Sequence, residues 1–567
     1  MKHFNYINFM RTLHVFTLLL CCSVYTFGQI STKEKAAVDQ IFAQWNKPGV
    51  PGCGLGIIKN GKLVYARGYG MANLEYALPN TPTSVFRIGS TSKQFTAACI
   101  VLLAKQGKLK LTNTLNQFFP AFPAYAKKIT VQHLLNHTSG IRDYLLLASL
   151  KGLESDSYYT DEDLMQWLVN QKELNFAPGD DYLYSNSGYW LLGQIVGKVA
   201  GMNMADFAKK EIFEPLGMAN THFHNDHNQI VKKRASGYMP RRKGGYRISM
   251  TTLNMIGDGG IFTTIEDIKK WDDAFYKHST FDQEFWRLMT KQGVLNNGRE
   301  IDYASGLMID KYKGLKTVSH GGAFVGFRAE LLRFPKQRFS VAIFTNRGDA
   351  NPTGMAYQVA DVLLKDQFEQ QKTSSQGNSA SATPKPIKLS KKSLEKFDGH
   401  YWNDARSYSR KIYVKNDTLR YFRSAASESS LVPIGNNQFK MLVRGNVVVK
   451  FNQQKSGKYD MVFVVNGREI ASSYQYTPKT YSAKEIKKFA GNYYSDELDI
   501  YYQLKLRNDA LQLFIDGKEQ FATKPVMENF FSNPRFGSLQ FQLDNNGKVK
   551  SFRLASGRVK NLKFVRK

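Results

Sequence analysis

An internal repeat near the C-terminal end constrains the fold of this sequence more than any other feature. Residues 394–401 (LEKFDGHY) correspond to residues 486–493 (IKKFAGNY), an offset of 92 residues, and Asn416-Asp417 corresponds to Asn508-Asp509 at the same offset. Alternating apolar and polar stretches follow each copy, separated by Asn-Asp and Asn-Gly pairs that are typical of turns between antiparallel strands. A solenoid normally needs three or more repeats. Two copies therefore predict two small antiparallel β modules of barrel-like form.

A linker separates this repeat from the rest of the chain. Residues 370–388 read QQKTSSQGNSASATPKPIK, with few apolar side chains and many Ser, Gln, Lys and Pro residues. Such a composition offers little surface to bury and is typical of a connection between domains. It divides the sequence into a first domain at 31–369, the linker, and β modules at 389–479 and 480–567.

The first domain mixes helical and strand-like patterns in an order that predicts an α/β (α+β) fold of two parts. Residues 54–58 and 63–66 flank Asn60-Gly61, a pair typical of a hairpin turn. Residues 327–334 and 340–344 predict two more strands, and a long, mainly helical region lies between the two pairs. Strands from both ends of the domain would then form one part and the helices the other, with a site in the cleft between them.

The first 28 residues are similar to a secretory signal. Lys2 and Arg11 provide positive charge, and residues 13–27 form an apolar run that is too short for an ordinary membrane span. We therefore expect a signal peptide at 1–28 and a secreted or periplasmic protein. The pair Cys21-Cys22 leaves lipoprotein anchoring as an alternative. No later stretch of the sequence is long and apolar enough to predict a transmembrane segment.

The chain is strongly basic, with a formal net charge of +31. A basic chain suggests nucleic acid as a partner. However, Lys and Arg are spread over the whole length, and the sequence contains no zinc-finger or RNP motif. We therefore expect no specific nucleic-acid partner and favour contact with a polyanionic surface such as the cell envelope.

A Ser-x-x-Lys motif, formed by Ser90 and Lys93, precedes a run of apolar residues with helical spacing at 95–103. On a helix that starts at Ser90, positions i and i+3 lie on one face, so the Lys93 ammonium can reach the Ser90 hydroxyl. Serine is a weak nucleophile until a base takes its proton, and lysine can be that base when its pKa is lowered. The motif alone also fits a Ser90 helix cap beside a solvated lysine.

Two further motifs follow in order, Tyr-x-Asn at 184–186 and His-Gly-Gly at 320–322. A tyrosine oxygen near Ser90 and Lys93 can share the proton relay, and Asn186 can bind a substrate amide and hold the lysine. A Gly-rich strand edge lets backbone N–H groups approach an acyl group and its oxyanion. Taken singly, the same residues would be a core aromatic, a turn residue and a bend.

Together, these motifs give the sequence a resemblance to the serine β-lactamase and penicillin-binding-protein superfamily, in its class C-like branch. This branch includes D-aminopeptidases, D-alanyl-D-alanine carboxypeptidases and esterases. The resemblance covers roughly residues 36–366 and extends to three accessory motifs, LLNHTSGI at 134–141, EPLGM at 214–218 and GGIFTT at 259–264. The two trailing β modules are similar in layout to those of D-aminopeptidases that carry two C-terminal β-barrels.

The resemblance implies a role for each motif residue. Ser90 would be the acylated nucleophile, Lys93 and Tyr184 the base system, and Asn186 a ligand of the substrate and the lysine. The substrate and its oxyanion would be bound by His320, Gly322 and the backbone N–H groups of Ser90 and Ala323. We therefore expect a serine hydrolase that cleaves a small peptide, amide or ester without metal or organic cofactor. A β-lactamase, a D-Ala-D-Ala carboxypeptidase and a catalytically silent penicillin-binding sensor are the alternatives.

The His-Gly-Gly motif departs from the Lys-Thr-Gly motif of many β-lactamases and carboxypeptidases of this superfamily. There, the lysine and the threonine hydroxyl help to hold a substrate carboxylate. Here, the neutral imidazole of His320 replaces a fixed cation. We therefore expect weak β-lactamase activity and a preference for substrates that lack a carboxylate at that point. Arg328, a few residues further on, could supply the missing charge.

A histidine-rich stretch offers a different interpretation. His222, His224 and His227 belong to an H-x-H-x-D-H pattern typical of dinuclear zinc hydrolases, in which metal-bound hydroxide is the nucleophile. The stretch directly follows the EPLGM motif, where the serine family has a variable surface connection. We therefore favour a polar loop here, and we expect His137, within LLNHTSGI, to serve in structural hydrogen bonding.

Overall fold

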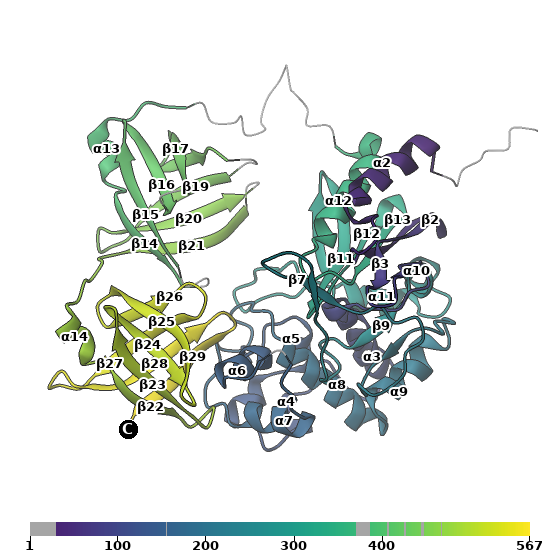
Figure 1. The fold of residues 1–567 in the computed structure, drawn as a ribbon, viewed down its shortest axis with the longest axis horizontal. Helices are drawn as coiled ribbons and strands as arrows, with labels where there is room; N and C mark the ends of the chain where they lie inside the picture. The colour runs from purple at the N-terminus through teal and green to yellow at the C-terminus, as the bar shows by residue number, and fades with distance from the viewer. Residues whose placement is uncertain are drawn as a thin grey trace, which may run out of the picture.

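The structure is a computed structural model, shown in Figure 1. It describes residues 30–154, 156–369, 386–404, 408–424, 427–443, 447–465 and 468–567. The predicted signal peptide, and residues 370–385 of the predicted linker, lie outside the described residues. Across the described ranges, none of the helices combines the length and the apolar character that a bilayer span requires.

The first domain is built around a six-stranded antiparallel sheet (Figure 1). Its strand order is β10 (Met308–Tyr312), β11 (Leu315–Phe324), β12 (Phe327–Phe334), β13 (Phe339–Thr345), β1 (Cys53–Lys59) and β2 (Lys62–Tyr69). Between β1 and β2, Asn60 and Gly61 have φ of 52° and 74°, as a two-residue type I′ turn requires. Pairing of β1 with β13 joins the two ends of the domain in one sheet.

Helices cover both faces of this sheet. On one face, α2 (Thr32–Phe42) and α12 (Pro352–Leu363) share an apolar core with β1 and β13. On the other face, α10 (Ile265–Lys277) lies against β1. Gly56 on β1 leaves room for Ile265, because a Cβ on Gly56 would lie 2.5 Å from the Ile265 side chain.

A mainly helical part completes the domain and shares one hydrophobic core with the inner face of the sheet. Its helices are α3 (Lys93–Lys105), α4 (Leu115–Phe118), α5 (Val131–Leu135), α6 (Tyr144–Leu150), α7 (Asp161–Val169), α8 (Asn186–Ala200), α9 (Met204–Ala208) and α11 (Gln283–Thr290). Short strands lie among them: β3 (Met71–Asn73), β4 (Leu78–Pro79), β5 (Phe86–Arg87), β6 (His222–Phe223), β7 (Tyr238–Pro240), β8 (Tyr246–Ile248) and β9 (Ile261–Thr263). The predicted two-part α/β fold is thus confirmed.

The two C-terminal modules are closed, eight-stranded antiparallel barrels, which confirms the prediction of two β-barrel-like domains. The first contains β14 (Gly399–Asn403), β15 (Tyr408–Lys415), β16 (Thr418–Ser424), β17 (Ser427–Gly435), β18 (Gln438–Met441), β19 (Val447–Gln453), β20 (Tyr459–Val465) and β21 (Arg468–Tyr476). The second contains β22 (Gly491–Ser495), β23 (Ile500–Arg507), β24 (Ala510–Ile515), β25 (Lys518–Met527), β26 (Phe530–Asn533), β27 (Gly537–Leu543), β28 (Val549–Ser556) and β29 (Val559–Arg566). A short helix precedes each barrel, α13 (Lys391–Glu395) or α14 (Ala483–Lys487).

The repeat preserves a hydrogen bond as well as a pattern. The hydroxyl of Tyr401 donates to the carbonyl of Phe397 over 2.9 Å, and that of Tyr493 donates to Phe489 over 2.8 Å. Each bond ties the first strand of a barrel to the turn before it. The residues that revealed the repeat in the sequence therefore hold the same place in both barrels.

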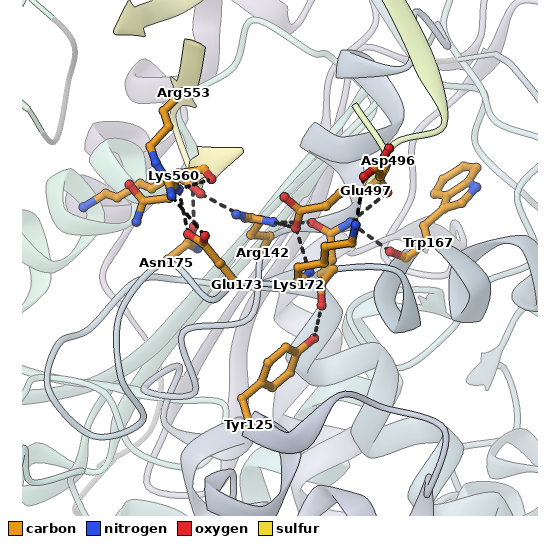
Figure 2. Close-up of polar contacts among 12 residues, drawn as sticks. Tyr125, Arg142, Trp167, Lys172, Glu173, Asn175, Asp496, Glu497, Arg553 and Lys560 are labelled. Atoms are coloured by element: carbon orange, nitrogen blue, oxygen red, sulfur yellow. Dashed lines mark hydrogen bonds and ion pairs between the residues drawn. The ribbon is translucent and has the colours of Figure 1, made fainter. Parts of the chain in front are cut away.

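The second barrel docks on the helical part of the first domain through polar contacts (Figure 2). At the centre, Arg142 and Glu497 form an ion pair whose side chains are 0% and 5% exposed. The backbone N–H of Lys560 donates to Asn175 over 2.7 Å, and its carbonyl accepts from Arg142 over 2.9 Å. Two exposed ion pairs flank this centre, Lys172 with Asp496 and Glu173 with Arg553. These contacts hold the β22–β23 turn, through Asp496 and Glu497, and the β28–β29 hairpin, through Arg553 and Lys560, against the first domain.

Candidate active site

Ser90 and Lys93 come together at the start of α3. Residues Gly89–Ser92 form a 3-10 turn and α3 begins at Lys93, so the α-helix starts three residues later than the sequence pattern predicts. A 3-10 turn aligns positions i and i+3, and Lys93 Nζ donates to Ser90 Oγ over 3.2 Å. The Ser-x-x-Lys spacing therefore brings the two groups into contact.

Lys93 lies entirely inside the protein. Its amine nitrogen also donates to the side-chain oxygen of Asn186 over 2.9 Å and to the backbone carbonyl of Asp258. Burial lowers the pKa of Lys93 to about 7, although the carboxylates of Asp258 and Asp143 act in the opposite direction. Much of the lysine is therefore neutral near pH 7, in the form that can accept a proton from serine.

Tyr184 lies next to Lys93, whose Nζ is 4.8 Å from the centre of the tyrosine ring. Its hydroxyl is buried and has no well-formed hydrogen bond among the described residues. Burial raises the pKa of Tyr184 well above its usual value, while the nearby Ser90 hydroxyl opposes that rise. The phenol therefore keeps its proton in the resting site, and it can pass a proton on but cannot serve as a phenolate base.

Asn186 is held in place from outside the site. Its backbone N–H, at the first turn of α8, donates to the carboxylate of Asp143 over 2.7 Å. The neighbouring N–H of Ser185 donates to Nδ1 of His137 over 3.1 Å, and the imidazole packs 4.1 Å from the Tyr184 ring. His137 thus aligns the whole Tyr-x-Asn motif through a hydrogen bond.

The edge of β11 approaches the Ser90 turn closely because glycines leave room. A Cβ on Gly322 would lie 1.9 Å from the carbonyl oxygen of Ile88. One on Gly89, which has a φ of +51°, would lie 2.9 Å from the backbone nitrogen of Ala323. The Ala323 nitrogen is therefore adjacent to the Ser90 turn, where the sequence predicts an oxyanion hole.

His320 is buried and neutral. Its Nδ1 lies 2.6 Å from the carbonyl of Gly321, which can only accept, so Nδ1 carries the proton and Nε2 accepts from the Tyr303 hydroxyl over 2.9 Å. Burial, aided by the charge of Lys93, lowers the pKa of His320 to about 3. The imidazole therefore supplies no positive charge at neutral pH.

Arg328 does not take the place of the missing lysine. Its Nη1 donates to the backbone carbonyls of Val325 and Phe327, over 2.9 and 2.6 Å. Burial also lowers the pKa of Arg328. The guanidinium lines the cavity but is already engaged by the turn between β11 and β12.

Comparison with known proteins identifies the family. A family model described as Beta-lactamase matches residues 38–364, which is more than half of the chain. The chain belongs to the beta-lactamase family. This confirms the superfamily resemblance carried by the three ordered motifs, and it places the matched segment over the whole of the six-stranded sheet and the helical part.

Two curated relatives and two solved structures extend this beta-lactamase-family assignment. A D-aminopeptidase of Gluconobacter oxydans is 27% identical over 333 residues, 59% of this chain and 62% of the relative. Penicillin-binding protein 4* of Bacillus subtilis is 29% identical over 306 residues, 51% of this chain and 66% of the relative. The chain thus spans less than two thirds of the length of each. Two solved structures share the fold. One is an octameric penicillin-binding protein homologue from Pyrococcus abyssi, with a TM-score of 0.52 and 22% identity over 86% of this chain and 98% of that chain. The other is a D-amino acid amidase from Ochrobactrum anthropi, with a TM-score of 0.51 and 22% identity over 59% of this chain and 100% of that chain.

Three further residues contribute to the site of this beta-lactamase-family chain, although none of the sequence motifs contains them. Asp143 accepts from Asn186, Tyr144 donates to the carboxylate of Asp258 over 3.0 Å, and the backbone carbonyl of Asp258 holds Lys93. A signal for Asp143 existed, since an acid before an apolar run is a typical helix cap and Asp143 lies two residues after LLNHTSGI. No local signal indicates that a backbone carbonyl at 258 would bind the lysine.

The site opens into a cavity of about 600 Å³ that the second barrel helps to enclose. Arg558, in the turn between β28 and β29, lines this cavity together with Ser90. Its guanidinium lies 5.6 Å from the centre of the Tyr184 ring and 3.2 Å from the carboxylate of Asp143. The sequence does not indicate that Arg558 belongs to the site, because Asp143 and Arg558 are 415 residues apart and no motif joins them.

The histidine-rich stretch lies outside this cavity. His222 Nε2 is 3.2 Å from His224 Nδ1, whereas the ring of His227 pairs with Asn254 at 3.1 Å. Within the ranges that the structure describes, no group of three or more His, Cys, Asp or Glu side chains is placed to hold a metal ion. The zinc-hydrolase alternative therefore lacks a ligand cluster there.

Proposed function

We propose that this protein is a serine hydrolase that acts through an acyl-enzyme on Ser90 and cleaves amide or ester bonds, in D-amino-acid peptides and amides or in small esters. One observation carries the proposal. Lys93 is buried, contacts the Ser90 hydroxyl at 3.2 Å, and has a pKa near neutrality. A serine with such a neighbour is an activated nucleophile.

The geometry supports the following acylation step. Neutral Lys93 accepts the proton of Ser90, and Oγ attacks the substrate carbonyl to form a C–O bond. The negative charge on the carbonyl oxygen would be stabilised by the backbone N–H groups of Ser90 and Ala323. When the C–N or C–O bond to the leaving group breaks, the proton on Lys93 passes through the Tyr184 hydroxyl to the departing amine or alcohol.

Deacylation repeats the same proton-transfer and addition steps with water as the nucleophile. Lys93, again neutral, takes a proton from water through the same relay, and the hydroxide adds to the ester carbonyl. Collapse of this intermediate breaks the bond to Ser90 Oγ, which recovers its proton from Lys93. The free acid is released, and no metal or organic cofactor takes part.

The D-amino-acid preference rests on relatives. The curated relative from Gluconobacter oxydans is named a D-aminopeptidase, and the Ochrobactrum structure is named a D-amino acid amidase. The relative from Bacillus subtilis is named a penicillin-binding protein, which keeps a β-lactamase or D-Ala-D-Ala carboxypeptidase as the second candidate. Neutral His320, at the usual position of a lysine, speaks against that candidate.

We also propose that the protein is secreted or periplasmic and that its positive charge brings it to polyanions of the cell envelope. The signal-like residues 1–28 and the net charge of +31 support this location. Fractionation of cells that express the tagged full chain would test it, and retention in the cytoplasm would contradict it.

The decisive experiment compares substrates on one preparation. The ratio of kcat/KM for a chromogenic cephalosporin to that for D-alanine amide should lie well below one. Loss of a charge-assisted hydrogen bond, worth about 1.5–3 kcal/mol, predicts a deficit of about ten- to a hundredfold on the cephalosporin. A ratio well above one would restore β-lactamase as the leading function. Labelling of Ser90 by a fluorophosphonate without any turnover would favour the silent sensor.

A further inference from the structure

Arg87 is a buried cation that forms no ion pair with any of the described residues. It lies on β5, three positions before Ser90, and is 6% exposed. Among the described residues its guanidinium has no hydrogen bond and no ion pair, and its Nε is completely buried without a partner. An arginine in such surroundings normally pairs with a carboxylate, because burying an unpaired charge is costly.

Two aromatic rings lie close to this charge. The guanidinium carbon lies 5.1 Å from the ring centre of Phe324 and 5.7 Å from that of Phe262. Such rings attract a cation but accept none of its N–H groups in the plane of the guanidinium. Five donors in a planar fork are therefore left without a strong acceptor, and this is the geometry that binds a carboxylate with two parallel hydrogen bonds.

Arg87 faces the same cavity as the nucleophile. Burial lowers the pKa of Arg87 to about 10, so the group remains charged at neutral pH. Two other arginines line the cavity, but Arg328 is bound to backbone carbonyls and Arg558 is paired with Asp143. Asp258 is the only acidic residue among the described residues that line the cavity. Its carboxylate accepts from Tyr144, and it favours the charged form of Arg87 without pairing with it.

We propose that Arg87 binds a carboxylate of the substrate, which makes anionic D-amino-acid peptides or amides the substrate class of this site. This role rests on the proposed function, since the carboxylate belongs to a molecule that acylates Ser90. It also differs from the Lys-Thr-Gly arrangement, because the cation comes from β5 and not from the β11 position of His320. The carboxylate can belong to an acidic acyl residue or to the C-terminal end of the leaving group.

Two pairs of near-isosteric substrates separate these sources. D-glutamyl and D-glutaminyl p-nitroanilides differ by a carboxylate in the acyl part, and D-alanyl-D-alanine and D-alanyl-D-alaninamide differ by one in the leaving group. The wild-type protein should prefer the carboxylate member of one pair by about ten- to a hundredfold in kcat/KM, the range that a hydrogen bond to a charged group gives. Arg87→Gln should bring that preference close to one, and Arg87→Lys should keep part of it.

Matched variants test whether the effect belongs to Arg87. Arg287→Gln removes an exposed guanidinium on α11, and this variant should retain the full preference. The inference is overturned if the wild-type protein shows no preference in either pair, or if Arg87→Gln keeps it. Loss of the preference in Arg558→Gln, with retention in Arg87→Gln, would assign the carboxylate to Arg558 and likewise overturn it.

Binding separates this inference from the proposed function. In the Ser90→Ala variant, calorimetry with the same four compounds should show tighter binding of the carboxylate member of one pair. If the wild-type protein hydrolyses none of the compounds but the variant binds with this preference, the proposed function fails and the role of Arg87 stands. If hydrolysis occurs without any preference in rate or binding, the role of Arg87 fails alone.

Discussion

At Lys93, burial lowers the pKa, whereas the carboxylates of Asp258 and Asp143 raise it. The amine gives up hydration for three oxygen acceptors, on Ser90, Asn186 and Asp258, and burial is the larger effect. Burial shifts Tyr184 the other way, because it disfavours the phenolate. The ordinary pKa values of Lys93 and Tyr184, 10.5 and 10.0, are thereby moved far apart. Of these two groups, Lys93 is the one that changes its protonation near pH 7.

This separation predicts the pH dependence of the reaction. Protonated Lys93 cannot accept the serine proton, so kcat/KM for D-alanine amide should fall below a pKa of about 7 and level off above it. A pH–rate profile of kcat/KM measures this acid limb directly. An acid limb near pH 10 would show that the lysine is solvated and would contradict its burial.

Substitution of the two motif residues should remove catalysis. Ser90→Ala and Lys93→Ala should each lower kcat/KM by about 10³-fold or more, because groups that act as a unit fail together. Ser90→Ala should also abolish labelling by fluorophosphonate or penicillin-type probes, while circular dichroism shows an unchanged fold. Full activity in a well-folded Ser90→Ala protein would refute the serine mechanism.

Among the elements, those with a local sequence pattern were predicted closely. The predicted strand at 327–334 coincides with β12, and the strand at 340–344 lies within β13. The start of α3 was wrong by three residues, because Gly89, with positive φ, turns the chain into a 3-10 segment first. The contact of Arg558 with Asp143 could not be predicted, since no periodicity records which barrel turn meets which helix.

The histidine-rich element should prove dispensable. Replacing His222, His224 and His227 together with Ala should leave most of the activity, because none of them lines the cavity. Chelators should have little effect on kcat/KM for the same substrate. Loss of activity with a chelator and recovery with zinc would instead support the metallohydrolase.

The β28–β29 hairpin should influence the base from a distance. The charge of Arg558 contributes to the lowered pKa of Lys93. Arg558→Gln should therefore raise that pKa and move the acid limb of kcat/KM to higher pH. Arg558→Lys, which keeps the charge, should move it less. Superimposable pH profiles of wild type and Arg558→Gln would show that the hairpin has no electrostatic role.

In the whole molecule, the buried Arg142–Glu497 pair connects the second barrel to the first domain (Figure 2). Glu497→Gln would leave the buried guanidinium uncompensated and should destabilise the docked β22–β23 turn, which contains residue 497, by about 3–5 kcal/mol. Hydrogen exchange in β22, β23 and β29, the strands next to Glu497 and Arg142, measures this loss. The adjacent control, Asp496→Asn, removes a pair whose side chains are 63% and 61% exposed and should cost less than about 1 kcal/mol. Equal protection in both variants would show that the ion pair does not hold the barrel.

The position of Arg558 has a consequence for how the protein is made. Ser90, Lys93, Tyr184 and Asn186 are synthesised long before Arg558, whose turn between β28 and β29 helps to close their cavity. Domains fold in order from the N-terminal end, so a chain can bring Ser90 and Lys93 together before the second barrel adds its wall to their cavity. The contact between Ser90 and Lys93 and the closed shape of the cavity around it are thus acquired at different moments in the formation of a single molecule.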